Sequence, residues 1–200
     1  YLAIKEGLNV EKVWDSYSIN TKANIGPNNG EKFSTNQKIF INSNKNHNLK
    51  IRRLKYKNNV NSKIRVIRGT NFDYFTQEAQ NNFFNKKFKI TNLVDRMGIR
   101  LSGTKLENTF STNIKSEGLV KGVIQVPADG NLIIMLADHG TIGGYPKIAT
   151  VISADLDNLA QLPPNSEISF TEVNLEEAEQ LYKKHLKELN KYISILNEFN

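Results

Sequence analysis

Residues 116–170 read SEGLVKGVIQVPADGNLIIMLADHGTIGGYPKIATVISADLDNLAQLPPNSEISF, and this stretch carries the strongest signal of the fold class. Its first two apolar runs, at 120–126 and 132–137, are joined by PADG, whose Asp-Gly pair has the chemistry of a tight turn. A further apolar run covers 148–153, and residues 167–173 alternate between apolar and polar with the period of a strand. Short strands joined by turns, without an intervening helix, predict a mainly antiparallel β architecture.

The chain before this stretch continues the β pattern and adds one helix. Short apolar runs predict strands at 1–4, 38–41, 64–67, 88–91 and 99–101. The segment NIGPNNG at 24–30 predicts a turn, because Gly, Pro and Asn are the residues that turns favour. Residues 71–84 predict a short amphipathic helix. Four apolar residues recur there at helical spacing and are expected in the core: Phe72, Phe75, Ala79 and Phe83.

The end of the chain predicts a long amphipathic helix at 175–200. Asn174 is a favourable N-cap, and Glu177 three residues later completes a capping-box pattern. An apolar stripe follows the helix: Leu175, Ala178, Leu181, His185, Leu186, Leu189, Ile193 and Leu196. We expect its first half to dock on the β structure, and its second half either docks there or meets a partner.

The composition is that of a globular protein, with 38% hydrophobic and 24% charged residues. No apolar run approaches the roughly 20 residues that span a bilayer, so no membrane partner is expected. The lack of cysteine excludes disulfides, thiolate metal sites and cysteine nucleophiles, and we expect a cytoplasmic protein.

The net charge of the chain is +7, and its basic residues are concentrated at 45–68. This segment either binds a polyanion or forms a Lys/Asn-rich surface loop. Because Tyr56 is the one aromatic residue there that can stack on a base, we favour the loop and expect no nucleic acid partner.

The segment TIGGYP at 141–146 holds the first group of candidate binding residues. Gly143 and Gly144 permit positive φ angles and a close approach of the backbone to a ligand or a neighbouring strand. Successive N–H groups in such a turn form an anion-binding nest for a carboxylate or a phosphate. Tyr145 and Lys147 flank the glycines with a hydroxyl and a cation. The alternative is an ordinary hairpin, since a Gly-Gly turn needs no ligand.

Charged and amide side chains near strand ends form the second group. Arg96 and Arg100 flank a tight turn, where an arginine pair either clamps a ligand carboxylate or binds a structural Asp or Glu. Asp138 ends an apolar run, where a carboxylate is costly to bury, so it is predicted to be a general base or a polar anchor. Gln125 ends another strand with an amide that can hold a substrate amide or ring, and Glu117 is a second candidate carboxylate. We expect no metal site, because none of the three histidines has a plausible metal-binding partner.

These residues resemble the C-subunit family of bacterial ATP-dependent 5-oxoprolinase. The same family is also described as allophanate hydrolase subunit 2, as a biotin-dependent carboxyltransferase-like domain and as a kinase-inhibitor antagonist. The resembling motifs after residue 115 are SEG at 116–118, GVIQVP at 122–127, AD at 137–138, TIGGYP at 141–146 and ISAD at 152–155. Upstream, the resembling segments are DRMGIRLSG at 95–103, IRVIRG at 64–69 and YLAIKEGL at 1–8. The resemblance therefore covers nearly the whole chain.

The resemblance implies a mainly β fold of cyclophilin-like barrels with short helices and a C-terminal helix. It implies three parts: the remainder of a first β subdomain at 1–60, a carboxyltransferase-like barrel subdomain at 61–174 and an amphipathic helix at 175–200. Two departures stand out. Family members carry a sizeable portion before the YLA strand, which we therefore expect this chain to lack. Their Gly-Gly-x-x-Gly-Arg loop reads GPNNGEKF here, with Glu31 in the place of the arginine.

The resemblance implies a protein that joins a B-subunit partner and an A-subunit protein to convert 5-oxoproline into L-glutamate with ATP. The chain contains no P-loop motif, so we expect ATP, as a substrate, at another kind of site or at one shared with the partner. Two alternatives stay open: a urea- or allophanate-type carboxyltransferase domain, and a non-catalytic regulator that binds a kinase-inhibitor-like partner. The candidate catalytic residues are Asp138, Arg96 and Arg100. The candidate substrate- or phosphate-binding residues are Gln125, Thr141, Gly143, Gly144, Tyr145, Lys147 and Glu117.

Overall fold

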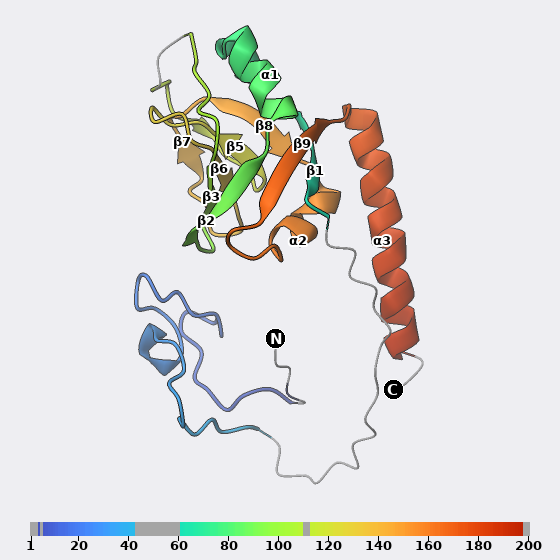
Figure 1. Ribbon diagram of the computed structural model, residues 1–200. Helices are drawn as coiled ribbons and strands as arrows, with labels where there is room; N and C mark the ends of the chain where they lie inside the picture. Colours follow the sequence, from blue (N-terminus) through green and yellow to red (C-terminus); the bar gives the residue numbers. More distant parts are fainter. Residues whose placement is uncertain (1–3, 5, 43–60, 110–112, 198–200) are drawn as a thin grey trace. The chain divides into compact units, whose positions relative to one another are not determined.

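The computed structural model describes residues 4, 6–42, 61–109 and 113–197 (Figure 1). The chain divides into two compact units, Tyr1–Tyr56 and Lys57–Asn200, each of which is described by itself. Most of the predicted strand at 1–4 and most of the basic segment at 45–68 lie outside the described residues. The predicted subdomain limits, 1–60, 61–174 and 175–200, stay predictions.

The described part of the first unit consists of turns and isolated bridges. The predicted turn at 24–30 is confirmed and contains a 3₁₀ turn, η1 (Asn28–Gly30). Gly26 has a φ of +119°, and a Cβ placed on it would lie 2.4 Å from the carbonyl oxygen of Ser18, so this turn requires glycine. The predicted strand at 38–41 is wrong, because only Ile41 pairs there, in a single bridge with Leu8. A strand needs a row of neighbouring partners, and one bridge does not supply a ladder.

The second unit is built around a closed seven-stranded barrel in the order β1-β8-β5-β6-β3-β2-β9. The strands are β1 (Lys63–Arg68), β2 (Phe88–Val94), β3 (Gly98–Ser102), β5 (Val123–Gln125), β6 (Ile133–Met135), β8 (Lys147–Val151) and β9 (Glu167–Glu172). Only the β1–β9 pair that closes the barrel is parallel. Two short strands, β4 (Glu117–Gly118) and β7 (Ile142–Gly143), form a separate antiparallel ribbon. The predicted mainly β fold with a barrel is confirmed.

The barrel strands match the apolar runs of the sequence, with shorter limits in the second half of the chain. The run at 120–126 forms a strand only from Val123, because Gly122 has a φ of +92°, outside the range of a strand. The PADG segment turns the chain from β5 into the antiparallel β6, as predicted, and Gly130 has the positive φ that this turn requires. Strand β9 alternates between buried and less buried residues, which confirms its predicted period of two.

Aromatic side chains fill one part of the barrel core. Phe83, Phe88 and Phe170 are almost fully buried, and the rings of Phe83 and Phe170 stack with centroids 4.6 Å apart. Phe83 comes from helix α1 (Gln77–Asn85), which contacts β9 and packs its buried face on the barrel. Burying such a side chain stabilises the fold by about 1.5–3 kcal/mol.

The predicted single helix at 71–84 is wrong in its extent. The segment begins with a 3₁₀ turn, η2 (Phe72–Tyr74), and Phe75 then takes an extended conformation and forms a bridge with Asn108. Helix α1 starts afterwards, where the hydroxyl of Thr76 accepts a hydrogen bond from the N–H of Ala79 at 3.1 Å. The four residues predicted for the core are all buried: Phe72, Phe75, Ala79 and Phe83.

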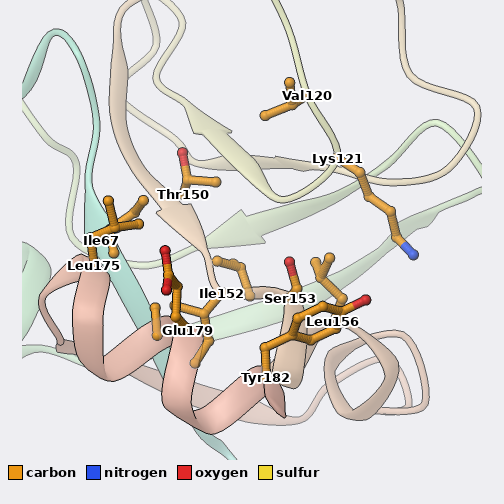
Figure 2. Close-up of a pocket in the computed structure, with 12 residues that line it drawn as sticks. Ile67, Val120, Lys121, Thr150, Ile152, Ser153, Leu156, Leu175, Glu179 and Tyr182 are labelled. Atoms are coloured by element: carbon orange, nitrogen blue, oxygen red, sulfur yellow. The ribbon is translucent and has the colours of Figure 1, made fainter. Parts of the chain in front are cut away.

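The chain then folds through η3 (Ser153–Asp155) and α2 (Leu156–Leu159) and ends in the long helix α3 (Leu175–Asn197). The predicted capping box is confirmed: Glu177 N–H donates to Asn174 Oδ1 at 2.8 Å, and Asn174 N–H donates to Glu177 Oε2 at 3.0 Å. Helix α3 contacts η3, and its Leu175, Ala178 and Tyr182 line a cavity of about 480 Å³ together with barrel residues (Figure 2). In the second half of the helix, Leu186 and Ile193 are exposed.

Candidate functional site

An irregularity in barrel strand β8 shapes the candidate site. In the pairing of β5 with β8, Ile124 lies opposite Ala149 but Gln125 lies opposite Lys147, so Ile148 is an extra residue in β8. One extra residue of this kind is a β-bulge, which redirects the side chains that follow it. Ile148 and Ala149 are neighbours in sequence and both belong to the core, as expected where a bulge interrupts the alternation of a strand.

The ammonium group of Lys147 lies at this bulge and is nearly buried. Only 9% of its side chain is exposed, and it forms an ion pair with the carboxylate of Glu117, of which 43% is exposed. Lys147 Nζ also lies 3.4 Å from the carbonyl oxygen of Gly118. A buried ammonium is costly unless such partners offset its charge. The short β4–β7 ribbon therefore supplies the groups that hold the lysine.

Gln125 lies beside Lys147 and is 3% exposed. Its Nε2 donates a hydrogen bond to the carbonyl oxygen of Tyr145 at 3.2 Å. A Cβ on Gly143 would lie 2.8 Å from this Nε2 and 2.9 Å from Leu119 Cδ1, so the backbone at Gly143 passes directly over the amide. The close backbone approach predicted for this glycine is confirmed.

The nest predicted at the two glycines is wrong. Neither Gly143 nor Gly144 has a positive φ, and Gly143 belongs to strand β7, opposite Glu117. Without a left-handed residue, the N–H groups do not converge as they do in an anion-binding nest. The carbonyl oxygen of Gly144 instead accepts a hydrogen bond from the N–H of Ile114 at 2.8 Å.

The structure thus brings five predicted residues together, and it adds Asn71, which the sequence did not indicate. Asn71 is 4% exposed, and its Oδ1 accepts a hydrogen bond from the N–H of Lys147 at 3.0 Å. In the sequence, Asn71 is a polar residue shortly after the IRVIRG segment, and this pattern does not indicate its hydrogen-bond partner. We call these residues the lysine cluster: Asn71, Glu117, Gln125, Gly143, Tyr145 and Lys147.

Arg96 and Asp138 form a second polar group. Arg96 Nε lies 2.6 Å from Asp138 Oδ2, Arg96 Nη2 lies 2.9 Å from Oδ1, and the N–H of Asp138 donates to the carbonyl oxygen of Arg96 at 2.8 Å. Hydrogen bonding by Arg96 is the main cause that lowers the pKa of Asp138, and the charge of Arg96 adds to it. A carboxylate held in this way is a weak base, so the geometry favours the polar-anchor alternative for Asp138.

Strand register separates this pair from the lysine cluster. Gly98 lies opposite Met135, and Arg100 lies opposite Ile133, which in turn lies opposite Gln125. Arg96 precedes Gly98 and Asp138 follows Met135, so the pair lies beyond one end of these strands, and Gln125 and Lys147 lie at the other end. Arg100 is on the row of Gln125, and its charge contributes to lowering the pKa of Asp129. Arg96 therefore lies away from the lysine cluster, whereas Arg100 lies on its row, two strands from Gln125.

Thr141 and the cavity contribute no side chain to the lysine cluster. Thr141 is exposed, and its carbonyl oxygen accepts a hydrogen bond from the N–H of Leu119 at 2.9 Å. None of the cavity-lining residues in Figure 2 belongs to the lysine cluster or to the Arg96–Asp138 pair. Among the described residues, no group of three or more acidic, histidine or cysteine side chains is placed to hold a metal ion. No helix in the described part of the chain is long and apolar enough to cross a membrane.

Comparison with known families identifies the family of the chain. The sequence model of the family "Carboxyltransferase domain, subdomain A and B" matches residues 1–172. The chain belongs to this carboxyltransferase-domain family. Residues 173–200, which include helix α3, follow the matched range.

Two bacterial proteins are similar to the chain. It is 34% identical to the 5-oxoprolinase C subunit of Escherichia coli K12 over 181 residues, which cover 89% of this chain and 57% of that protein. It is 37% identical to the 5-oxoprolinase C subunit of Haemophilus influenzae over 137 residues, which cover 68% of this chain and 44% of that protein. The chain therefore spans about half the length of the relatives that it matches.

Among solved structures, the urea amidolyase of Kluyveromyces lactis contains a similar fold. It superposes with a TM-score of 0.77 at 25% identity, over 95% of this chain and 13% of that much longer one. The chain is thus similar to parts of two kinds of protein, a 5-oxoprolinase subunit and a urea amidolyase.

Proposed function

We propose that the chain is one component of an ATP-dependent 5-oxoprolinase, which converts 5-oxoproline into L-glutamate in the cytoplasm. The observation that carries this proposal is the 34% identity to the C subunit of the Escherichia coli enzyme over 89% of the chain. The chain covers only 57% of that relative, so we propose that it acts within a complex with B-subunit-like and A-subunit-like proteins.

The residue types of the lysine cluster support a role in lactam opening. Opening the ring breaks its C–N bond and adds water, and we propose that ATP first activates the lactam as a phosphorylated intermediate. The ammonium of Lys147 would stabilise negative charge on carboxylate or phosphoryl oxygens, which is worth most in a nearly buried site. The Gln125 amide would hold the lactam, and the half-exposed Glu117 carboxylate would orient the Lys147 ammonium.

Asp138, Arg96 and Arg100 remain proposed catalytic residues from the sequence. The placement of Arg96 and Asp138 away from the lysine cluster supports a different division of labour, in which this pair anchors a loop or a partner and Lys147 contacts the substrate. Arg96→Ala and Asp138→Ala would then weaken complex assembly before they weaken turnover. Loss of turnover with the complex intact would restore a catalytic role for the pair.

The deciding experiment measures glutamate formed from 5-oxoproline and ATP by the full chain co-expressed with its A-subunit and B-subunit homologues. Lys147→Met is expected to lower kcat by about 10²-fold or more, the size of effect typical for a lost charge-stabilising group. Lys87→Met is the matched control, because Lys87 pairs with Glu167 at 3.1 Å on the exposed surface. A wild-type complex that produces no glutamate would refute the proposal. Equal turnover in the Lys147 and Lys87 variants would refute the site.

One alternative function has a specific observation in its favour. The fold shared with urea amidolyase over 95% of the chain supports a carboxyltransferase domain acting on urea or allophanate. The same complex, supplied with a carboxylated biotin carrier and urea, tests this alternative by the transfer of labelled carboxyl groups. An intact complex with neither activity would favour the non-catalytic regulator.

A further inference from the structure

The bulge in β8 decides which way Lys147 points. Val151 and Ala149 lie two residues apart in β8 and both belong to the barrel core. A regular strand would continue this alternation and direct Lys147, two residues before Ala149, into the same core. The extra residue Ile148 reverses the alternation, so that the ammonium instead meets Glu117 and the carbonyl of Gly118.

Asn71 holds both main-chain polar groups of Lys147 at this bulge. Its Oδ1 accepts a hydrogen bond from the N–H of Lys147 at 3.0 Å, and its own N–H donates to the carbonyl oxygen of Lys147 at 3.2 Å. Both residues are buried, with 4% and 7% of their surface exposed. Removing the Asn71 side chain would therefore leave a buried N–H without its acceptor.

Gly69 permits this arrangement. Its N–H donates to the carbonyl oxygen of Ile148 at 2.9 Å, and a Cβ placed on it would lie only 2.2 Å from the carbonyl oxygen of Lys147. The chain that leaves β1 can thus approach the bulge closely enough for Asn71 to reach the main chain of Lys147. Gly69 and Asn71 thus both form hydrogen bonds with the main chain of the β8 bulge, Gly69 at Ile148 and Asn71 at Lys147.

We infer that Asn71 is a positioning residue, which acts through the main chain of Lys147 to keep the β8 bulge and so to direct the ammonium to Glu117 and the carbonyl of Gly118. This inference rests on the proposed function in one respect, namely that the Lys147 ammonium contacts the substrate. The orientation of the Lys147 side chain can be measured without turnover.

The test measures how fast acetic anhydride acetylates Lys147 in the full chain, followed by peptide mass spectrometry. Lys183, whose side chain is 71% exposed on α3, is the internal reference. In Asn71→Ala, Lys147 is expected to react about fivefold faster than in the wild type, the order that one lost buried hydrogen bond implies. Asn71→Asp keeps an oxygen acceptor of the same size and is expected to restore slow labelling. Should Asn71→Ala not fold, Asn71→Ser, whose hydroxyl is too short to reach, replaces it.

Asn158→Ala is the matched control for general destabilisation. Asn158 also binds both main-chain polar groups of another residue. Its Oδ1 accepts a hydrogen bond from the N–H of Asn61 at 2.9 Å, and its Nδ2 donates to the carbonyl oxygen of Asn61 at 2.6 Å. Faster labelling of Lys147 in Asn71→Ala alone supports the inference. Equal labelling in the two variants overturns it, since Asn71 would then be an ordinary structural residue.

Turnover of the complex separates this inference from the proposed function. If the wild-type complex forms glutamate, Asn71→Ala is expected to lower kcat more than it raises KM, and Asn71→Asp to recover most of the loss. If the wild-type complex forms none, the proposed function fails, and the labelling rates still decide whether Asn71 aims Lys147.

Discussion

Glu117 and Lys147 form an ion pair that joins two separate sheets, because Glu117 belongs to the β4–β7 ribbon and Lys147 to barrel strand β8. The lysine side chain is 9% exposed and the glutamate side chain is 43% exposed. Each residue therefore depends on the other in a different way: the ammonium needs a partner, whereas water can solvate the carboxylate.

This asymmetry predicts that Glu117→Gln destabilises the fold more than Lys147→Met. The glutamine leaves a nearly buried ammonium without a full counter-charge, at a cost of about 1–3 kcal/mol in the free energy of unfolding. The methionine removes the charge and keeps most of the apolar stem, so its cost is smaller. Urea denaturation of both variants checks the order. Glu167→Gln, in an exposed pair, is the control and should cost at most about 1 kcal/mol. The reverse order would mean that Lys147 is well solvated.

Alanine substitutions at two glycines of the β4–β7 ribbon are expected to differ in their effect on stability. Gly143→Ala places a methyl group 2.8 Å from Gln125 Nε2 and should displace that amide, at a cost of about 1–3 kcal/mol and with a loss of activity. Gly118→Ala meets no atom within 4 Å and should be nearly neutral. Thermal denaturation and turnover of the two variants, measured side by side, check this contrast. A neutral Gly143→Ala would show that the amide is free to move.

The carboxylate of Asp155 predicts a large effect on stability outside the lysine cluster. It is 5% exposed, and it accepts hydrogen bonds from Arg65 N–H at 2.8 Å, from Arg65 Nε at 3.0 Å and from Nη2. This bonding also raises the pKa of Arg65. Asp155→Asn is expected to lower the free energy of unfolding by about 2–3 kcal/mol, because the guanidinium loses its counter-charge. Asp157→Asn, at an exposed carboxylate two residues away, should change it little. Similar losses in the two variants would contradict this reasoning.

The Arg96–Asp138 pair predicts a pH dependence at the acidic end. Hydrogen bonding by Arg96 lowers the folded-state pKa of Asp138 below its unfolded value of about 3.9. Its contribution to stability is therefore present above about pH 4 and is lost as the pH falls through the lower folded-state pKa. Carbon-detected NMR titration should find the Asp138 midpoint below the ordinary value, and Arg96→Ala should return it there. A midpoint above pH 4 would favour Asp138 as the general base.

Much of the fold could be predicted because its signals are local. Strand β9 shows its period of two within six residues, the Asp-Gly turn lies between the strands that it joins, and the capping box links Asn174 to Glu177, three positions later. The errors also arise locally. A threonine cap starts α1 later than the helical pattern predicts, and the apolar run at 38–41 lacks a ladder partner.

The candidate site was predicted as a set of residues but not as an arrangement. Five predicted residues lie together, namely Glu117, Gln125, Gly143, Tyr145 and Lys147, and their binding roles stay predictions. Arg96 and Asp138, which were also predicted for the site, lie beyond the other end of these strands in the register of β3, β6 and β5. No local pattern in the sequence marks strand register or a bulge, since both depend on which strands become neighbours.

Residue types and their spacing were enough to establish that this chain forms short strands, where they turn, where its last helix begins and which family it resembles. These properties follow from side-chain period, turn chemistry and capping, which act between residues a few positions apart. The folded arrangement was needed to show that Asn71, 76 residues before Lys147, holds its N–H, and that Glu117 rather than a distant arginine faces its ammonium. The reason is that closing the barrel sets the strand order and the bulge, and these determine which buried polar groups must find each other as partners.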